Sequence, residues 1–253
     1  MSPNIIAALR VKNESRWIAD VLESIKWCRR IYVFDDHSSD DTPQIANRCG
    51  AWVYLSPFMD FDEARDKEFL TKKIAEEWDF NTWILMIDGD EILAPGGKSE
   101  ILNTIDDNMG MNAFSLRILY LWNSPDQIRI DGVYGKFHRP SLFRLGREYI
   151  FRRTLPDGNL HCSNVPARYL SNYGYCPAKI FHLGYMHRED RINKWKYYNE
   201  IDPRNINEGY DARCPGRGAY PHIVQGDIPE VPEDAVLKHA GPLKLQPLGE
   251  NKQ

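Results

Sequence analysis

Short apolar runs alternate with segments of helical periodicity through the first ninety residues. Four continuous apolar runs are typical of strands that are buried on both faces: residues 4–9, 31–34, 52–55 and 83–87. The segments between them repeat apolar side chains at helical spacing and predict helices near residues 18–25, 43–49 and 61–78. Strands that alternate with helices predict an α/β fold, with a mostly parallel central sheet flanked by helices.

The second half of the chain gives a weaker pattern. It predicts helices at residues 99–107 and 188–200, and strands at residues 114–121, 128–134 and 141–145. After residue 201 Pro, Gly and charged residues become frequent and the periodicity is lost. We therefore expect one domain over residues 1–205, followed by an irregular tail over residues 206–253.

Composition narrows the class of protein. The chain has 253 residues, 42% of them hydrophobic and 27% charged, which is ordinary for a globular protein. A net charge of −4 does not favour a nucleic-acid partner. The 5 cysteines form no C-x-x-C pair, and neither a signal peptide nor a spanning apolar segment is visible. We expect a cytoplasmic protein, free or peripherally attached to a membrane, with no transmembrane segment.

Polar clusters follow three of the predicted strands, at residues 10–14, 35–41 and 88–91. Ligands bind beyond the carboxyl ends of parallel strands, so these clusters should form one site. The last cluster places three carboxylates in four positions, Asp88, Asp90 and Glu91, which favours a bound hard cation. Gly89 would allow a metal or phosphate to approach the backbone. The alternative is an acidic turn, or a helix that starts at Asp90 and Glu91.

These motifs resemble those of a family 2 glycosyltransferase with the GT-A fold. RVKNE (residues 10–14) is similar to the family's first-strand motif, DDHSSDDT (residues 35–42) to its second, and EAR (residues 63–65) to its A-R-N segment, with Asp66 in place of Asn. Asp88-Gly89-Asp90 matches the D-x-D motif. The resemblance implies that the nucleotide-sugar donor is bound by Arg10, Val11, Lys12, Glu14, Asp36, Arg65, Asp88, Gly89 and Asp90.

The resemblance also implies a metal ion and a division of the domain. Mn²⁺ or Mg²⁺ would be held by Asp88 and Asp90, with the late His182 completing its shell. The other interpretation of His182, which lies in an apolar segment, is a buried core residue. Residues 1–125 would bind a nucleotide sugar, a UDP- or GDP-sugar, and residues 126–205 an acceptor, which is a glycan, a lipid-linked molecule or a protein.

Inverting transfer, which the family implies, needs a carboxylate that takes the proton of the acceptor hydroxyl. Asp131 and Asp157 are the candidates for this base. Each precedes a glycine, so each could instead be a turn residue. Residues 136–153 hold six Lys or Arg and one acid, which form either a basic wall for an anionic ligand or an ordinary solvated face.

Two other classes of function stay open. A sugar nucleotidyltransferase has an α/β fold and acidic metal sites, but it needs a glycine-rich phosphate loop, and residues 10–17 contain no glycine. A non-catalytic nucleotide- or carbohydrate-binding module would bind a donor without transferring its sugar. An EF-hand Ca²⁺ loop is poorly supported, because DGDE lacks the alternating acids and the distal Glu.

Overall fold

A computed structural model of the chain describes residues 3–131, 134–153, 161–201 and 236–239. The helices are α1 (Ile18–Ile25), α2 (Thr42–Arg48), α3 (Glu63–Glu77), α4 (Gly97–Asp107), α5 (Arg188–Ile201) and the short 3₁₀ helix η1 (Ala167–Tyr169). The strands are β1 (Asn4–Val11), β2 (Arg30–Asp35), β3 (Trp52–Leu55), β4 (Thr82–Met86), β5 (Glu91–Leu93), β6 (Ala113–Trp122), β7 (Ser124–Arg129), β8 (His138–Arg144), β9 (Phe151–Arg153), β10 (Cys162–Pro166), β11 (Gly174–His182) and β12 (Val236–His239).

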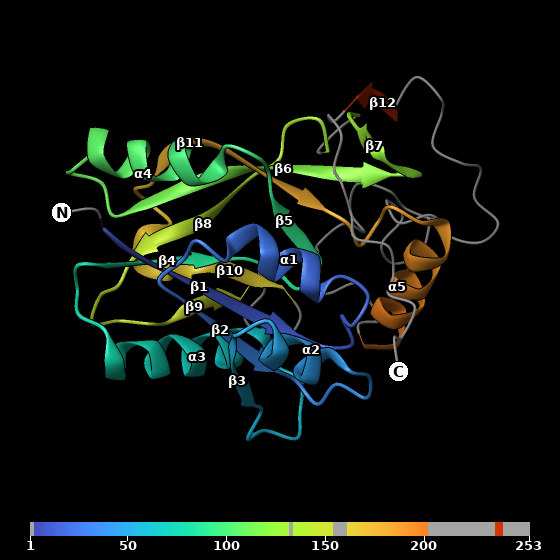
Figure 1. The fold of residues 1–253 in the computed structure, drawn as a ribbon, viewed down its shortest axis with the longest axis horizontal. Helices are drawn as coiled ribbons and strands as arrows, with labels where there is room; N and C mark the ends of the chain where they lie inside the picture. The colour runs from blue at the N-terminus through green and yellow to red at the C-terminus, as the bar shows by residue number, and fades with distance from the viewer. Residues whose placement is uncertain (1–2, 132–133, 154–160, 202–235, 240–253) are drawn as a thin grey trace.

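One large sheet runs through the molecule (Figure 1), in the order β12-β7-β6-β8-β4-β1-β2-β3. The strands β3, β2, β1 and β4 are parallel neighbours, as the alternation of strands and helices predicted. Beyond β4 the directions are mixed, because β8 runs antiparallel to both β4 and β6. The strand β11 pairs in parallel with β6 and antiparallel with β5, and β9 and β10 form a separate pair. The predicted α/β fold is confirmed, and its parallel part is mainly the first half.

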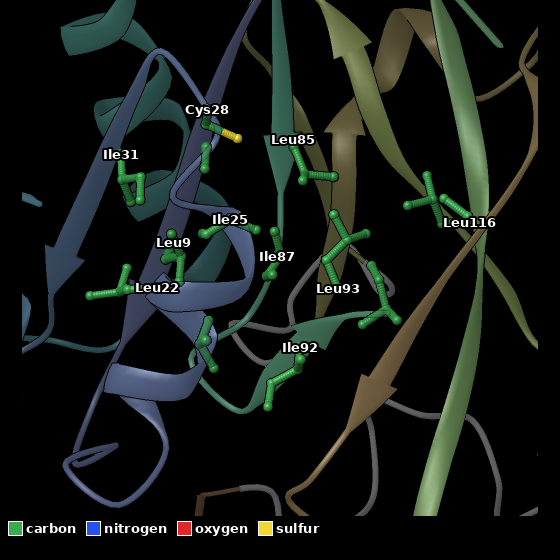
Figure 2. Close-up of a cluster of buried hydrophobic side chains, with 14 of the residues drawn as sticks. Leu9, Leu22, Ile25, Cys28, Ile31, Leu85, Ile87, Ile92, Leu93 and Leu116 are labelled. Carbon is green, nitrogen blue, oxygen red and sulfur yellow. The ribbon is translucent and has the colours of Figure 1, made fainter. Parts of the chain in front are cut away.

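Helices cover both faces of this sheet because β1 is apolar on both sides. Ile5, Ala7 and Leu9 belong to one buried cluster, which also contains apolar residues of α1 and α4. Figure 2 shows part of this cluster, with Leu9 beside side chains of α1 and of the β4–β5 segment. Ile6 and Ala8 belong to the cluster on the opposite face, with residues of α3 and of the β9–β10 pair. A strand buried in this way needs the continuous apolar run seen in the sequence.

Two local predictions are corrected. The strand expected at residues 128–134 is β7, which ends at Arg129 and starts directly after a tight turn at Asn123, a residue with φ of 66°. Pairing with β6 on one side and β12 on the other overrides the low strand propensity of Pro125 and Asp126. Glu91 starts the strand β5 and not a helix, because β11 supplies its ladder partners.

The segment expected to be an irregular tail, residues 206–253, is largely outside the described residues. Within it, Val236–His239 is the strand β12, which pairs antiparallel with β7, so this part is not irregular. A strand of four residues gives too short a pattern to be recognised among the surrounding Pro and Gly. In the part of the chain that the structure describes, no helix is long and apolar enough to cross a bilayer.

Candidate active site at the ends of β1, β2 and β4

The three predicted polar clusters meet at one edge of the sheet. In the parallel ladders Val11 lies opposite Asp35, and Ala8 lies opposite Met86, so β1, β2 and β4 end side by side. The loop after β1 closely approaches the acidic turn after β4. A Cβ atom on Gly89 would lie 2.8 Å from Cγ of Glu14 and 2.9 Å from Cγ1 of Val11. Gly89 is therefore required for the close approach of the Val11 and Glu14 side chains, and its expected role towards a metal or phosphate stays a prediction.

The segment after β1 is fixed to the segment after β2 by backbone donors. The backbone N–H of Asn13 donates to Oγ of Ser38 (2.9 Å), and that of Glu14 donates to Oγ1 of Thr42 (2.8 Å). In return, Oδ1 of Asn13 accepts from the backbone N–H of Ser39 (2.8 Å), and Asn13 has a φ of 57°. Ser38, Ser39 and Thr42, which belong to or directly adjoin the pattern of the second motif, thus hold the first motif in place.

A buried ion-pair network lies on the β2 side of this edge. Arg10 donates to Oδ2 of Asp36 (2.6 Å) and to Oδ2 of Asp66 (2.9 Å), and Nζ of Lys12 is 3.4 Å from Oδ2 of Asp36. Asp66 also pairs with Arg65 at 3.0 Å. Burial raises the pKa of Asp66, and its bonds with Arg10 and Arg65 oppose that rise. The aspartate that replaces the family's Asn is therefore an anchor for two of the predicted donor-binding residues.

Asp88 and Glu91 share one cation from β8. Nη1 of Arg139 lies 2.9 Å from Oδ2 of Asp88, and Nη2 lies 2.5 Å from Oε2 of Glu91. The same oxygen of Glu91 accepts from the backbone N–H of Asp88 (2.9 Å), which closes the turn. Glu91 is fully buried, and this burial raises its pKa to about 7 against the opposing effect of Arg139. Arg139 thus belongs to the site, and the solvated-face interpretation is wrong for this residue of the 136–153 stretch.

Two side chains, one from the end of β11 and one from α5, approach Asp90. Nζ of Lys194 on α5 lies 2.7 Å from Oδ2 of Asp90, and Nε2 of His182 lies 3.7 Å from the same oxygen. The backbone carbonyl of Asp90 accepts from the N–H of Leu183 (2.8 Å), so the end of β11 is tied to the turn. A Cβ on Gly184 would lie 2.1 Å from Oδ2 of Asp90, so only glycine leaves room for this pair.

The electrostatics of Asp90 and His182 follow from this burial. Burial alone would raise the pKa of Asp90, but His182 and Lys194 hold it well below the usual range, so Asp90 is an anion. Burial lowers the pKa of His182 to about 4, with Lys194 acting in the same direction and Asp90 opposing it. At neutral pH the imidazole is therefore uncharged, which is the form that can bind a metal.

The contacts of α5 explain why Lys194 reaches the turn. His187 stacks on Trp17 with ring centroids 6.2 Å apart, and Asp190 pairs with Arg16 at 3.1 Å. Arg191, which is buried, donates to the backbone carbonyls of residues 185 and 186 (2.7 and 3.0 Å). Positions 187, 190, 191 and 194 share one face of a helix. Lys194 was not predicted as a site residue, because a lysine on a helix gives no sign in the sequence of a carboxylate 104 positions away with which it pairs.

The residues expected to hold a metal are only partly brought together. Oδ2 of Asp90 and Nε2 of His182, 3.7 Å apart, could both contact one divalent cation with bonds of about 2.1 Å. Nδ1 of His182 is buried and has no hydrogen-bond partner within the described residues. Asp88 points to Arg139 instead, and the described ranges contain no group of three acidic, His or Cys side chains suited to a metal. The donor chemistry fits a divalent cation, with Lys194 on the shared oxygen.

Of the two candidate bases, Asp131 lies within the described residues. Asp131 lies two residues beyond the end of β7, and not within the strand predicted at residues 128–134, since residues 130 and 131 have left the ladder. Both of its oxygens accept from Arg129, at 2.5 and 2.9 Å. Asp157 lies outside the described residues. Among the described residues, Asp131 is bonded to Arg129 and not to Asp88, Asp90 or His182.

The chain is similar over part of its length to several bacterial proteins. It is 33% identical over 142 residues to an uncharacterized glycosyltransferase of Rickettsia conorii, which covers 55% of this chain and 48% of that protein. It is 36% identical over 138 residues to an uncharacterized glycosyltransferase of Rickettsia felis, covering 53% of this chain and 46% of that protein. The protein RfbJ of Shigella flexneri is 30% identical over 108 residues, which cover 42% of this chain and 78% of RfbJ.

The chain belongs to the same family as RfbJ. Its resemblance to glycosyltransferases is confirmed by the names of its relatives, although the matches span less than half the length of the Rickettsia proteins. No family model matches the chain. Among solved structures, it is similar to glucosyl-3-phosphoglycerate synthase of Mycobacterium tuberculosis, in complex with Mn²⁺, UDP and glucosyl-3-phosphoglycerate. That match has a TM-score of 0.38 and 21% identity, and covers 47% of this chain and 44% of the other.

Proposed function

We propose that this protein is a glycosyltransferase that moves a sugar from a nucleotide-sugar donor to an acceptor hydroxyl. The observation that supports this most directly is the convergence of three segments at one edge of the sheet. The acidic turn with Asp88 and Asp90 lies against Glu14, and the Arg10–Asp36 pair lies on the neighbouring strands. The names of the Rickettsia relatives support the same class of reaction.

The donor nucleotide is assigned to the β1–β2 side of the edge. Asp36 would accept hydrogen bonds from the base, while Arg10 and Lys12 hold its carboxylate in position. Arg65, stacked 3.9 Å from the ring centroid of Phe58 and paired with Asp66, would face the donor from α3. Val11, at the end of β1, and Glu14, in the loop that follows, are predicted to contact the donor through backbone and side-chain atoms. A UDP- or GDP-sugar is the expected donor.

The donor diphosphate is assigned to the β4 side of the edge. Asp90 and His182 would hold Mn²⁺ or Mg²⁺ there, with Asp88 supporting, and the bound ion would act as a Lewis acid on the leaving diphosphate. Asp90 is the residue best suited to this task, because it is buried and anionic. The neutral imidazole of His182 offers a lone pair on the same side.

Transfer with inversion also needs a base for the acceptor. Asp131 and Asp157 remain the candidates, and Asp131 would have to exchange its bonds with Arg129 for the acceptor hydroxyl. The acceptor is expected to be a glycan, a lipid-linked molecule or a protein. Determination of the anomeric configuration of the product by NMR tests inversion, because retention would remove the need for this base.

The test of the proposed function is a screen of UDP-, GDP-, CMP- and dTDP-sugars with Mn²⁺, followed by transfer assays with the donor that binds. Asp90→Asn should reduce transfer by at least about 10²-fold, since it removes the buried charge that holds the ion. Asp107→Asn, at the exposed end of α4, is the matched control and should retain activity. Donor binding without transfer or hydrolysis would indicate a binding module. Release of pyrophosphate from a sugar phosphate and a nucleoside triphosphate would indicate a nucleotidyltransferase.

A further inference from the structure

Lys194 lies on the side of Asp90 where the ligands of a bound metal ion would meet. Its Nζ lies 2.7 Å from Oδ2 of Asp90, and His182 approaches that same oxygen to 3.7 Å. One carboxylate oxygen therefore faces an ammonium and an imidazole at the same time. Gly184 is built for this arrangement, because a Cβ there would lie 2.1 Å from Oδ2 of Asp90 and 2.4 Å from Nζ of Lys194.

We propose that Lys194 is an internal counter-cation that competes with the divalent metal for Asp90, and so determines the metal affinity of the site. This inference rests on the metal site of the proposed function. A divalent ion that binds Oδ2 of Asp90 must displace the ammonium from that oxygen, because two cations cannot share it at contact distance. The competition lowers the apparent affinity for the ion by the free energy of the ion pair that is broken.

The packing of α5 allows this exchange without disturbing the fold. The helix is held at its N-terminal end, through the stacking of His187 just before it, the ion pair of Asp190 and the buried Arg191. Lys194 itself contributes a flexible four-carbon side chain, which is 25% exposed, whereas the side chain of Asp90 is 6% exposed. The ammonium can therefore move into solvent while the helix and the carboxylate keep their places.

The charge around the turn makes a divalent ion an effective competitor. Glu14 and Asp88 both lie close to Asp90, and the negative charge of each carboxylate opposes the ionisation of its neighbours. Arg139 pairs with Asp88, and the single charge of Lys194 compensates the remaining negative charge around Asp90 only in part. An ion of twice the charge compensates more of it at the same oxygen, so the exchange can favour the metal at adequate concentration.

The experiment measures Mn²⁺ binding directly, by the loss of the electron paramagnetic resonance signal of free Mn²⁺, with the full chain and no donor. Lys194→Met should bind Mn²⁺ at least about tenfold more tightly than the wild type, because no charged hydrogen bond of Asp90 has to be broken. Lys194→Arg keeps the cation and should stay within about threefold of the wild type. Lys196→Met, an exposed lysine on the same helix, removes an equal charge away from Asp90 and should leave the affinity unchanged.

Unchanged or weaker Mn²⁺ binding by Lys194→Met overturns the inference, as does the absence of Mn²⁺ binding in both proteins. If circular dichroism shows that Lys194→Met does not fold, Lys194→Gln is the second variant, since its neutral amide can still donate to Asp90. In the background of Asp90→Asn, Lys194→Met should no longer change the affinity, which separates competition for Asp90 from a general charge effect. Failure of sugar transfer with the Mn²⁺ shift intact would refute the proposed function and leave this inference standing.

Discussion

Replacing Arg139 by methionine should destabilise the protein, because the buried acid Glu91 loses its cation. Arg139 makes two ionic hydrogen bonds, to Asp88 (2.9 Å) and to Glu91 (2.5 Å). The side chain of Asp88 is 35% exposed, so water replaces much of its lost partner and the cost is under about 1 kcal/mol. Glu91 is fully buried, and leaving one member of a buried pair without its cation costs about 3–5 kcal/mol. The unpaired Glu91 therefore accounts for most of the expected loss in the free energy of unfolding.

The same reasoning gives a pH dependence with a definite sign. The pKa of Glu91 is raised from 4.5 to about 7 in the folded protein, so near pH 5 the native carboxyl is already protonated and needs the cation less. As the pH rises through 7, the Glu91 carboxylate of the wild type ionises and is stabilised by the guanidinium of Arg139. The variant lacks this guanidinium, so its folded state does not gain that stabilisation. The variant's deficit in unfolding free energy should consequently be larger at pH 8 than at pH 5.

Urea unfolding followed by tryptophan fluorescence measures this deficit at both pH values. Arg147→Met removes an exposed arginine from the loop after β8 and should change stability by no more than about 0.5 kcal/mol. The double variant Arg139→Met with Glu91→Met should recover most of the loss, because an apolar pair can replace a buried ion pair. A deficit below about 1 kcal/mol at pH 8, or one that is equal at pH 5 and pH 8, would refute the reasoning.

Three further predictions concern single residues of the site. Gly89→Ala should lower stability by about 1–3 kcal/mol in a thermal melt, because its Cβ would overlap Glu14 and Val11 at 2.8 and 2.9 Å; an unchanged melting temperature would contradict this contact. Since burial lowers the pKa of His182 to about 4, the native protein loses stability as the pH falls from 6.5 towards 4, and His182→Ala should flatten that part of the stability profile in urea titrations. Asp36→Ala should weaken binding of the nucleoside diphosphate by about 1–3 kcal/mol in calorimetry, and equal affinities would exclude Asp36 from the base site.

The sequence by itself determined the first half of the fold. The apolar runs at residues 4–9, 31–34, 52–55 and 83–87 are the strands β1 to β4. β1, β2 and β4 are buried almost throughout, because a strand covered on both faces must be apolar at nearly every position, whereas the edge strand β3 is partly exposed. The second half was harder because its strands pair in mixed directions and depend on distant partners. β5 and β7 are strands through pairing with β11 and β6, and no local pattern of three to six residues encodes such a partner.

The same division holds for the candidate site. Asp36, Asp88 and Asp90 could be placed from the sequence, because they directly follow recognisable strands whose ends meet in a parallel sheet. Arg139 and Lys194 could not, since they lie 51 and 104 positions from the acids that they neutralise. A charged side chain in a sequence gives no sign of whether it will be solvated or buried. Only the tertiary structure decides this, because burial of a cation is stable only where a distant segment supplies its carboxylate.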